Sequence, residues 1–204
     1  TAGTITSSVR ANTTAGFSIV TYTGNQTAGA TVGHGLGVKP SLIVVKCRGA
    51  TTSWPVYIAS RGATKWLLLN SAQAEKTTSQ EWNNTEPTSS VFTIGNSSSN
   101  SNQSSTYVAY CFAEVAGYSK AFSYTGNGST DGPFVFVNHR PAWLLLKRTD
   151  TTGNWTVLDL RREGYNVDND PLYPNLADAE GTTDLADILS NGFKLRSTDA
   201  SVNA

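Results

Sequence analysis

Short apolar runs, separated by Gly, Asn, Ser and Pro, set the pattern of the first half of the chain. Residues 17–22 alternate apolar and polar side chains and end at Thr-Gly-Asn, which predicts a half-buried strand followed by a turn. Residues 42–45 are apolar at every position, which predicts a strand covered on both faces. A polar segment, residues 71–90, is expected to hold one helical turn near 72–75. Further strands are predicted over residues 54–58, 66–69, 91–94 and 107–112.

The same order of runs returns in the second half of the chain, offset by 101 residues. Four pairs share this offset: Pro40 and Pro141, Lys46 and Lys147, Trp54 and Trp155, and Phe92 and Phe193. A short helix is predicted over residues 185–189. A repeat of about 101 residues is a small domain rather than one turn of a solenoid. Strands of the second copy are predicted over residues 118–124, 134–137, 143–146, 155–160 and 193–195.

These patterns predict an all-β chain of two tandem antiparallel β-sandwich units, jelly-roll-like in build. The first unit, with an N-terminal extension, is assigned to residues 1–115 and the second to residues 116–204. The second is predicted to lack its last strand, because the run at 107–112 would recur only beyond Ala204. A missing strand leaves an open sheet edge. Its alternative occupants are residues 4–9, a continuation of the chain or a neighbouring chain, and we favour the continuation.

Composition agrees with this fold and restricts the partners. Thr, Ser, Asn, Gly and Val are abundant and suit strands and turns. The net charge of zero argues against a nucleic-acid-binding protein, and no run approaches the roughly 20 apolar residues of a membrane helix. Four acids and eight bases give residues 1–130 a charge of +4, whereas eleven acids and seven bases give residues 131–204 a charge of −4. Either the copies or neighbouring chains dock through opposite charges, or the two surfaces have drifted apart.

Catalytic and metal-binding patterns are weak. Cys47 and Cys111 fall in predicted strands and are either bridged or two buried thiols. His34 and His139 do not occupy matching repeat positions, and no CxxC or Cys/His set suggests a metal site. We therefore predict no catalytic residue, no metal and no cofactor. Acidic residues gather in the second copy at Asp159, Glu163, Asp168, Asp170, Asp184 and Asp187.

The acidic group has three interpretations. Asp168-Asn169-Asp170 offers hard oxygen ligands for Ca²⁺, but it lacks the Gly and distal Glu of an EF-hand loop. Paired carboxylates also cleave polysaccharides when they are held at a defined separation. The third interpretation, which we favour, is a solvated loop.

Sugar binding is predicted from aromatic side chains in the two polar segments where the copies diverge. Flat aromatic faces stack on sugar rings, while Asn and Asp bind hydroxyl groups, and such residues collect in loops. The candidate ligand-binding residues are Trp82, Asn83, Tyr165, Asn166, Asp168 and Tyr173.

Five stretches carry a resemblance to a known family: residues 17–25, 33–40, 107–114, 140–150 and 190–196. They resemble a repeat family of uncharacterised domains in tail-associated and other virion structural proteins of marine tailed bacteriophages. The resemblance extends from about Ser8 onward over nearly the whole chain. It implies a virion appendage such as a tail fibre, receptor-binding protein or head fibre.

The resemblance and the residues together favour a non-enzymatic module on the virion surface, which acts in assembly and host-surface adhesion. Its expected partners are other virion proteins, copies of itself and a host cell-surface glycan, with no nucleic acid and no membrane insertion. The alternative is a carbohydrate-binding module of a polysaccharide-degrading protein.

Overall fold

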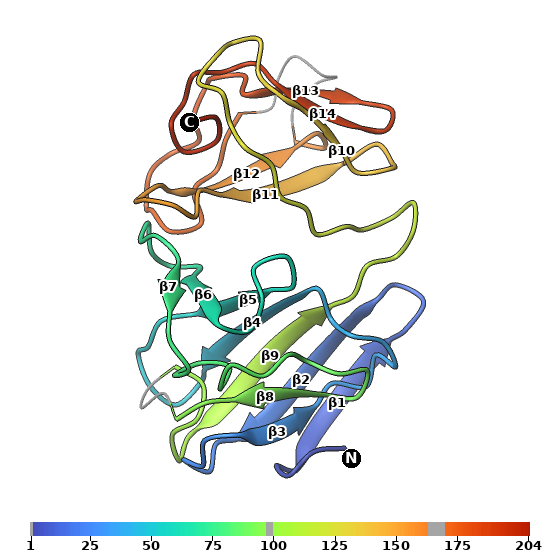
Figure 1. Ribbon diagram of the computed structural model, residues 1–204, viewed down its shortest axis with the longest axis vertical. Coiled ribbons are helices and arrows are strands. Elements are labelled where there is room, and N and C mark those ends of the chain that lie inside the picture. Colours follow the sequence, from blue (N-terminus) through green and yellow to red (C-terminus); the bar gives the residue numbers. More distant parts are fainter. Residues whose placement is uncertain (1, 97–99, 163–169) are drawn as a thin grey trace. The chain divides into compact units, whose positions relative to one another are not determined.

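The fold is all-β, as expected from the alternating apolar pattern (Figure 1). The computed structural model describes residues 2–96, 100–162 and 170–204, and every regular element in them is a strand. These residues include no helix that could cross a membrane. The chain divides into two compact units: unit 1 is Thr1–Leu69 with Glu75–Ala121, and unit 2 is Asn70–Ala74 with Phe122–Ala204.

Unit 1 is built on a seven-stranded antiparallel sheet with the order β1-β2-β9-β4-β5-β6-β7. A two-stranded sheet, β3-β8, lies over one face of it (Figure 1). The two layers together make the sandwich. Its strands are β1 (Ser7–Asn12), β2 (Phe17–Thr23), β3 (Ala30–Gly33), β4 (Leu42–Cys47), β5 (Pro55–Ile58), β6 (Lys65–Leu68), β7 (Lys76–Thr77), β8 (Val91–Ile94) and β9 (Thr106–Phe112).

β9 is the central strand of unit 1 because it pairs along its length with both β2 and β4. Alternate β9 side chains, those of Tyr107, Ala109 and Cys111, point into the core between the two layers and are buried. They meet Phe92 and Ile94 of β8 there. Full burial of one large apolar side chain stabilises a fold by about 1.5–3 kcal/mol, so this layer of contacts supplies much of the driving force for folding unit 1.

The two cysteines of unit 1 are free and buried, which excludes the disulfide alternative. The register pairs Ile43 with Cys111 and Cys47 with Tyr107, so the thiols sit four residues apart along neighbouring strands. At about 3.3 Å per residue this is roughly 13 Å, beyond the 7 Å Cα separation that a disulfide tolerates. Burial raises the pKa of the Cys111 thiol to about 12.

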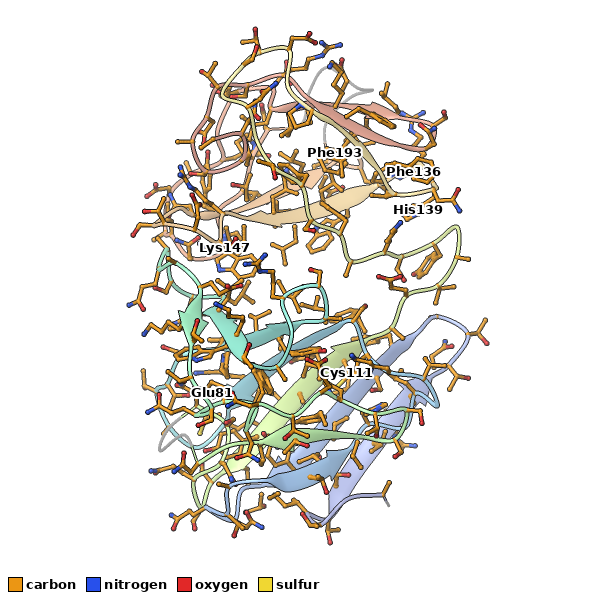
Figure 2. The ribbon with its side chains drawn as sticks, in the orientation of Figure 1. Glu81, Cys111, Phe136, His139, Lys147 and Phe193 are labelled. Atoms are coloured by element: carbon orange, nitrogen blue, oxygen red, sulfur yellow. The ribbon has the colours of Figure 1, made fainter. Side chains whose placement is uncertain are left out.

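Unit 2 has five strands in its described residues, arranged as a three-stranded sheet, β10-β14-β13, and a two-stranded sheet, β11-β12. Val135 and Phe193 from the first sheet pack in one apolar core with Leu144, Leu146 and Leu158 from the second. Figure 2 shows Phe193, which is fully buried. The strands are β10 (Phe134–Phe136), β11 (Trp143–Lys147), β12 (Trp155–Asp159), β13 (Ala186–Leu189) and β14 (Gly192–Leu195).

The helix predicted over residues 185–189 is wrong, because this segment is strand β13. Ala186 and Ile188 are buried while Asp187 lies between them and binds Arg196 at 2.6 Å, a period of two rather than 3.6. A two-residue turn connects β13 to β14, and an antiparallel hairpin satisfies the backbone hydrogen bonds that a four-residue helix would leave open. The helical turn predicted near 72–75 is also not formed.

One strand prediction is wrong, and one of the three alternatives for the missing strand is excluded. Residues 118–124 do not form a strand, because no described segment pairs with them along a ladder. The N-terminal residues form β1, which pairs with β2 inside unit 1. The N-terminal segment therefore does not supply the strand predicted to be missing from the second copy.

One buried asparagine arrangement occurs in each unit, and we call it the asparagine clasp. In unit 1 the Asn102 amide oxygen accepts hydrogen bonds from the Asn25 and Gln26 N–H groups at 3.0 and 3.2 Å. The Asn102 amide nitrogen donates to the Thr27 and Gly95 carbonyls at 2.9 and 2.7 Å. Three of these hydrogen bonds join the β2–β3 turn to the segment that leads into β9, and the fourth joins that segment to Gly95 at the end of β8.

The clasp of unit 2 is centred on Asn203, 101 residues after Asn102. Its amide oxygen accepts from the Asn127 N–H at 2.9 Å, and its amide nitrogen donates to the Ser129 and Ser197 carbonyls at 2.7 Å each. Each clasp packs closely against a glycine that has no room for a side chain. A Cβ on Gly24 would lie 2.1 Å from the nearest backbone oxygen, and a Cβ on Gly126 would lie 2.4 Å from one. We keep the tandem repeat as an interpretation that explains why the clasp occurs twice.

Candidate functional site

The most prominent surface of unit 1 is the face of the seven-stranded sheet that points away from the core. Residues on β2, β4 and β9 alternate between the core and this second face, where apolar side chains lie together with Thr21 and Lys46. We call six of the apolar residues on this face the outer patch. It consists of Phe17, Ile19, Leu42, Val108, Tyr110 and Phe112.

Strand register brings the outer patch together from segments nearly 100 residues apart. Phe17, Phe112 and Leu42 lie side by side in one row across the three strands. The rings of Phe17 and Phe112 are 4.7 Å apart between centroids. In the next row on the same face Ile19 lies beside Tyr110. Ile19 is 39% exposed and Phe112 37%, so apolar surface at the centre of the sheet faces solvent.

A shallow hollow of about 300 Å³ adjoins the end of this surface where β4 and β9 meet. The Ser41 N–H donates to the Phe112 carbonyl at 2.7 Å and fixes the two strand ends there. The hollow is lined by Val38, Lys39, Pro40, Ser41, Ala59, Ala113 and Glu114.

Glu86 organises the charged groups near this hollow. Its carboxylate accepts hydrogen bonds from Lys39 at 2.8 Å, from the Tyr57 hydroxyl at 2.6 Å and from the Ala63 N–H at 2.6 Å. Burial raises the pKa of the Glu86 carboxyl, but the hydrogen bonds from Lys39, Tyr57 and Ala63 outweigh it and hold the pKa below its usual value. Three donors already satisfy this carboxylate, which therefore braces the loops around β5.

Trp82, the first predicted sugar-binding residue, lies in the core of unit 1 and is only 2% exposed. Its ring contacts Tyr57 edge to face at a centroid distance of 5.9 Å. Protein covers both ring faces, so Trp82 does not offer the exposed stacking surface that the sugar-binding prediction requires. Sequence reasoning placed it at the surface because its neighbours are polar.

The other predicted site residues are not assembled into one site by the described part of the structure. Asn83 is partly buried in a turn with φ of 50°, in unit 1. Tyr173 is partly buried in unit 2, and burial raises the pKa of its hydroxyl. Tyr165, Asn166 and Asp168 lie outside the described residues.

Of the two histidines that sequence reasoning considered, His34 is held by backbone groups. His34 is buried, its Nε2 lies 3.2 Å from the Thr88 carbonyl oxygen, and its Nδ1 accepts from the Leu36 N–H at 3.3 Å. This pattern fits a neutral imidazole, and burial lowers the pKa of His34. Among residues 2–96, 100–162 and 170–204, no three His, Cys, Asp or Glu side chains gather where they could hold a metal ion.

With this geometry in place, the family comparison gives one result. Residues 1–204 match a family model described as a domain of unknown function, DUF7483. The chain belongs to this family. Comparison of this chain with curated proteins and with solved structures gives no match.

Sequence reasoning missed the outer patch although a signal for it was present. Residues 42–45 and 107–112 are apolar at both odd and even positions, and we interpreted the first of these runs as a strand covered on both faces. The β3-β8 layer covers the inner face. On the outer face Val44 and Val56 are buried, whereas Ile19 and Phe112 are partly exposed and mark the candidate functional surface.

Proposed function

We propose that this chain is a non-enzymatic module of a virion surface that associates with other copies of itself or with other virion proteins, and that serves host-surface adhesion. The observation that carries the association is the outer patch. It consists of apolar residues on three strands paired with one another, so its backbone is held in place before binding. The virion setting rests on the family resemblance of the five stretches described above.

The outer patch suits contact with a second copy of the chain. Six uncharged side chains on three paired strands lie in adjacent rows, with Thr21 and Lys46 beside Val108, and Ile19 and Phe112 remain partly exposed. Exposed apolar patches on a soluble protein mark interaction surfaces. Two such faces related by a two-fold axis would contact each other with the same residues on both sides.

A double substitution, Ile19→Lys with Phe112→Lys, tests this association. Each Lys places a charge in the middle of the patch, where burying it unpaired is unfavourable, so we expect self-association to weaken by about 100-fold. Native mass spectrometry and light scattering across a concentration series measure the effect.

The matched control for this experiment carries the same added charge elsewhere. Thr14→Lys with Thr130→Lys adds two Lys at exposed positions outside the patch and should leave association unchanged. A wild-type chain that stays monomeric at about 100 µM, or a control pair that weakens association equally, would contradict the proposal.

A second candidate function, carbohydrate binding, is favoured by Trp143 in unit 2. Its indole is 55% exposed on β11, and the register places Asp159 of β12 directly opposite. An exposed indole beside a carboxylate combines a stacking surface with a hydroxyl acceptor. Neither residue is among the six candidate ligand-binding residues, although Asp159 belongs to the acidic group identified in the sequence.

A glycan array with wild-type and Trp143→Ala protein tests the second candidate. Binding to a bacterial-surface glycan that falls at least 10-fold in the variant would support carbohydrate recognition, since loss of one stacking ring removes about 1–3 kcal/mol. Leu189→Ala, another partly exposed apolar residue of unit 2, serves as the control. If the wild-type protein binds no glycan on the array, the result would favour the assembly role alone.

A further inference from the structure

Several features that surround β9 in unit 1 have a counterpart in unit 2. The β4–β5 ladder pairs Leu42 with Ile58 and Val44 with Val56. The β11–β12 ladder pairs Trp143 with Asp159 and Leu145 with Val157, each residue 101 positions later. The β3–β8 pair of Val32 with Phe92 has a counterpart in Val135 with Phe193, in which Phe193 is 101 positions after Phe92 and Val135 is 103 positions after Val32.

The contacts that precede β9 are also repeated. The Tyr22 hydroxyl donates to the Ser101 carbonyl at 2.8 Å, and the Tyr124 hydroxyl donates to the Val202 carbonyl at 2.7 Å. Tyr22 meets Phe92 edge to face at 6.2 Å, and Tyr124 meets Phe193 edge to face at 6.0 Å. The asparagine clasp follows in both units. Unit 2 therefore has the flanking strand, the tyrosine and the clasp of a β9 position.

No described strand occupies that position in unit 2. In unit 1, β9 lies between β2 and β4 and pairs with both (Figure 1). In unit 2, β11 pairs only with β12 among the described strands, and residues 122–125, which correspond to the end of β2, pair with none. Tyr22 stacks on Tyr107 of β9 at 5.2 Å, whereas Tyr124 stacks on Phe122 at 6.4 Å instead.

We propose that the open edge of β11 is a strand-acceptor site. It takes an extended polypeptide segment antiparallel to β11, between β11 and residues 122–125. Backbone N–H and C=O groups of Trp143–Lys147 supply the hydrogen bonds, as in other cases where a peptide adds a strand to a sheet edge. The site is distinct from the outer patch of unit 1, so either can fail without the other.

The side chains around this edge define the ligand. In unit 1, Ile43 and Val45 of β4 are paired with the small residues Cys111 and Ala109 of β9. Leu144 and Leu146 of β11 correspond to Ile43 and Val45, and both are buried in the core of unit 2. The strand that fits therefore carries small side chains on its inner face.

An aromatic residue two positions before the first small residue completes the pattern. Tyr107 occupies this place in β9, where it stacks on Tyr22, and in unit 2 an aromatic there would stack on Tyr124. The acceptor site thus selects a segment of the form aromatic-x-small-x-small. Residues 107–111 of β9 have this form.

A synthetic peptide of residues 104–114, made with Cys111→Ser, tests the site in the full 204-residue chain. We expect hydrogen exchange of the β11 amides, Trp143–Lys147, to slow at least about 10-fold at saturating peptide. The thermal midpoint of unit 2 should rise by about 4 °C, because the peptide binds the folded state alone.

The control peptide has Arg at both inner positions, Ala109→Arg and Cys111→Arg, with the same length and outer residues. It should leave the β11 amides unchanged, because charged side chains cannot enter the core beside Leu144 and Leu146. The β4 amides serve as an internal reference, since β9 already covers that edge. No slowing at about 1 mM peptide, equal slowing by the control, or a change at β4 would overturn the proposal.

Discussion

Replacing Asn102 by Ala is expected to destabilise unit 1 by about 3–5 kcal/mol, because each buried polar group left without a partner costs about 1–3 kcal/mol. Asn102 is only 1% exposed and makes four hydrogen bonds to backbone groups. Water cannot replace the amide there without opening the turn. Urea unfolding, with hydrogen exchange of the β2 and β9 amides to assign the transition to unit 1, measures the loss.

Two comparisons sharpen this prediction. Asn12→Ala, at an exposed position with one hydrogen bond, should destabilise by less than about 1 kcal/mol. Asn203→Ala should lower the stability of unit 2 through the equivalent hydrogen bonds, with little effect on unit 1. A loss below about 1 kcal/mol for Asn102→Ala would show that the clasp is not a principal support of the fold.

Replacing Trp82 by Ala is expected to destabilise unit 1 by about 3–5 kcal/mol, the usual effect of removing a large buried aromatic. The indole is part of the core and packs against Tyr57, so its removal leaves a cavity that the sheet cannot close. The same urea and hydrogen-exchange measurement applies.

Trp82→Phe separates a core role from a ligand-binding role. Phenylalanine keeps most of the apolar volume, and the Trp82 Nε1 has no hydrogen-bond partner among the described residues, so we expect a loss below about 1.5 kcal/mol. A ligand platform would behave differently, since Trp82→Ala would then reduce glycan binding while leaving stability within about 1 kcal/mol. That outcome would return Trp82 to the candidate binding residues.

Much of the strand pattern could be predicted because alternation of apolar and polar residues reflects a local geometric property. Successive strand residues point to opposite faces, so the run at residues 17–22 identified β2, and the runs at 42–45 and 107–112 identified β4 and β9. The failure at residues 185–189 has a local cause as well. Five residues are too few to distinguish a period of two from 3.6, and the tight turn into β14 decided the outcome.

The candidate sites were harder to predict because they depend on long-range neighbours. Trp82 sits among polar residues in the sequence yet is buried, since the chain folds it back against Tyr57. Phe17 and Phe112 are 95 positions apart and become adjacent only when β2 pairs with β9. The hydrogen-bonding roles of Asn102 and Asn203 gave no sequence signal in a chain rich in Asn, because any exposed turn accepts the same residue.

The amino-acid order alone specified an all-β chain, most of its strands and the 101-residue spacing of matching positions, because these follow from side-chain alternation and turn-forming residues. Tertiary structure decided the rest. It placed β9 between β2 and β4, left Ile19 and Phe112 partly exposed on the outer face of that sheet, and left β11 with an open edge among the described strands. Strand order and register are set by pairing between distant segments, and no local pattern encodes which distant segment a strand will meet.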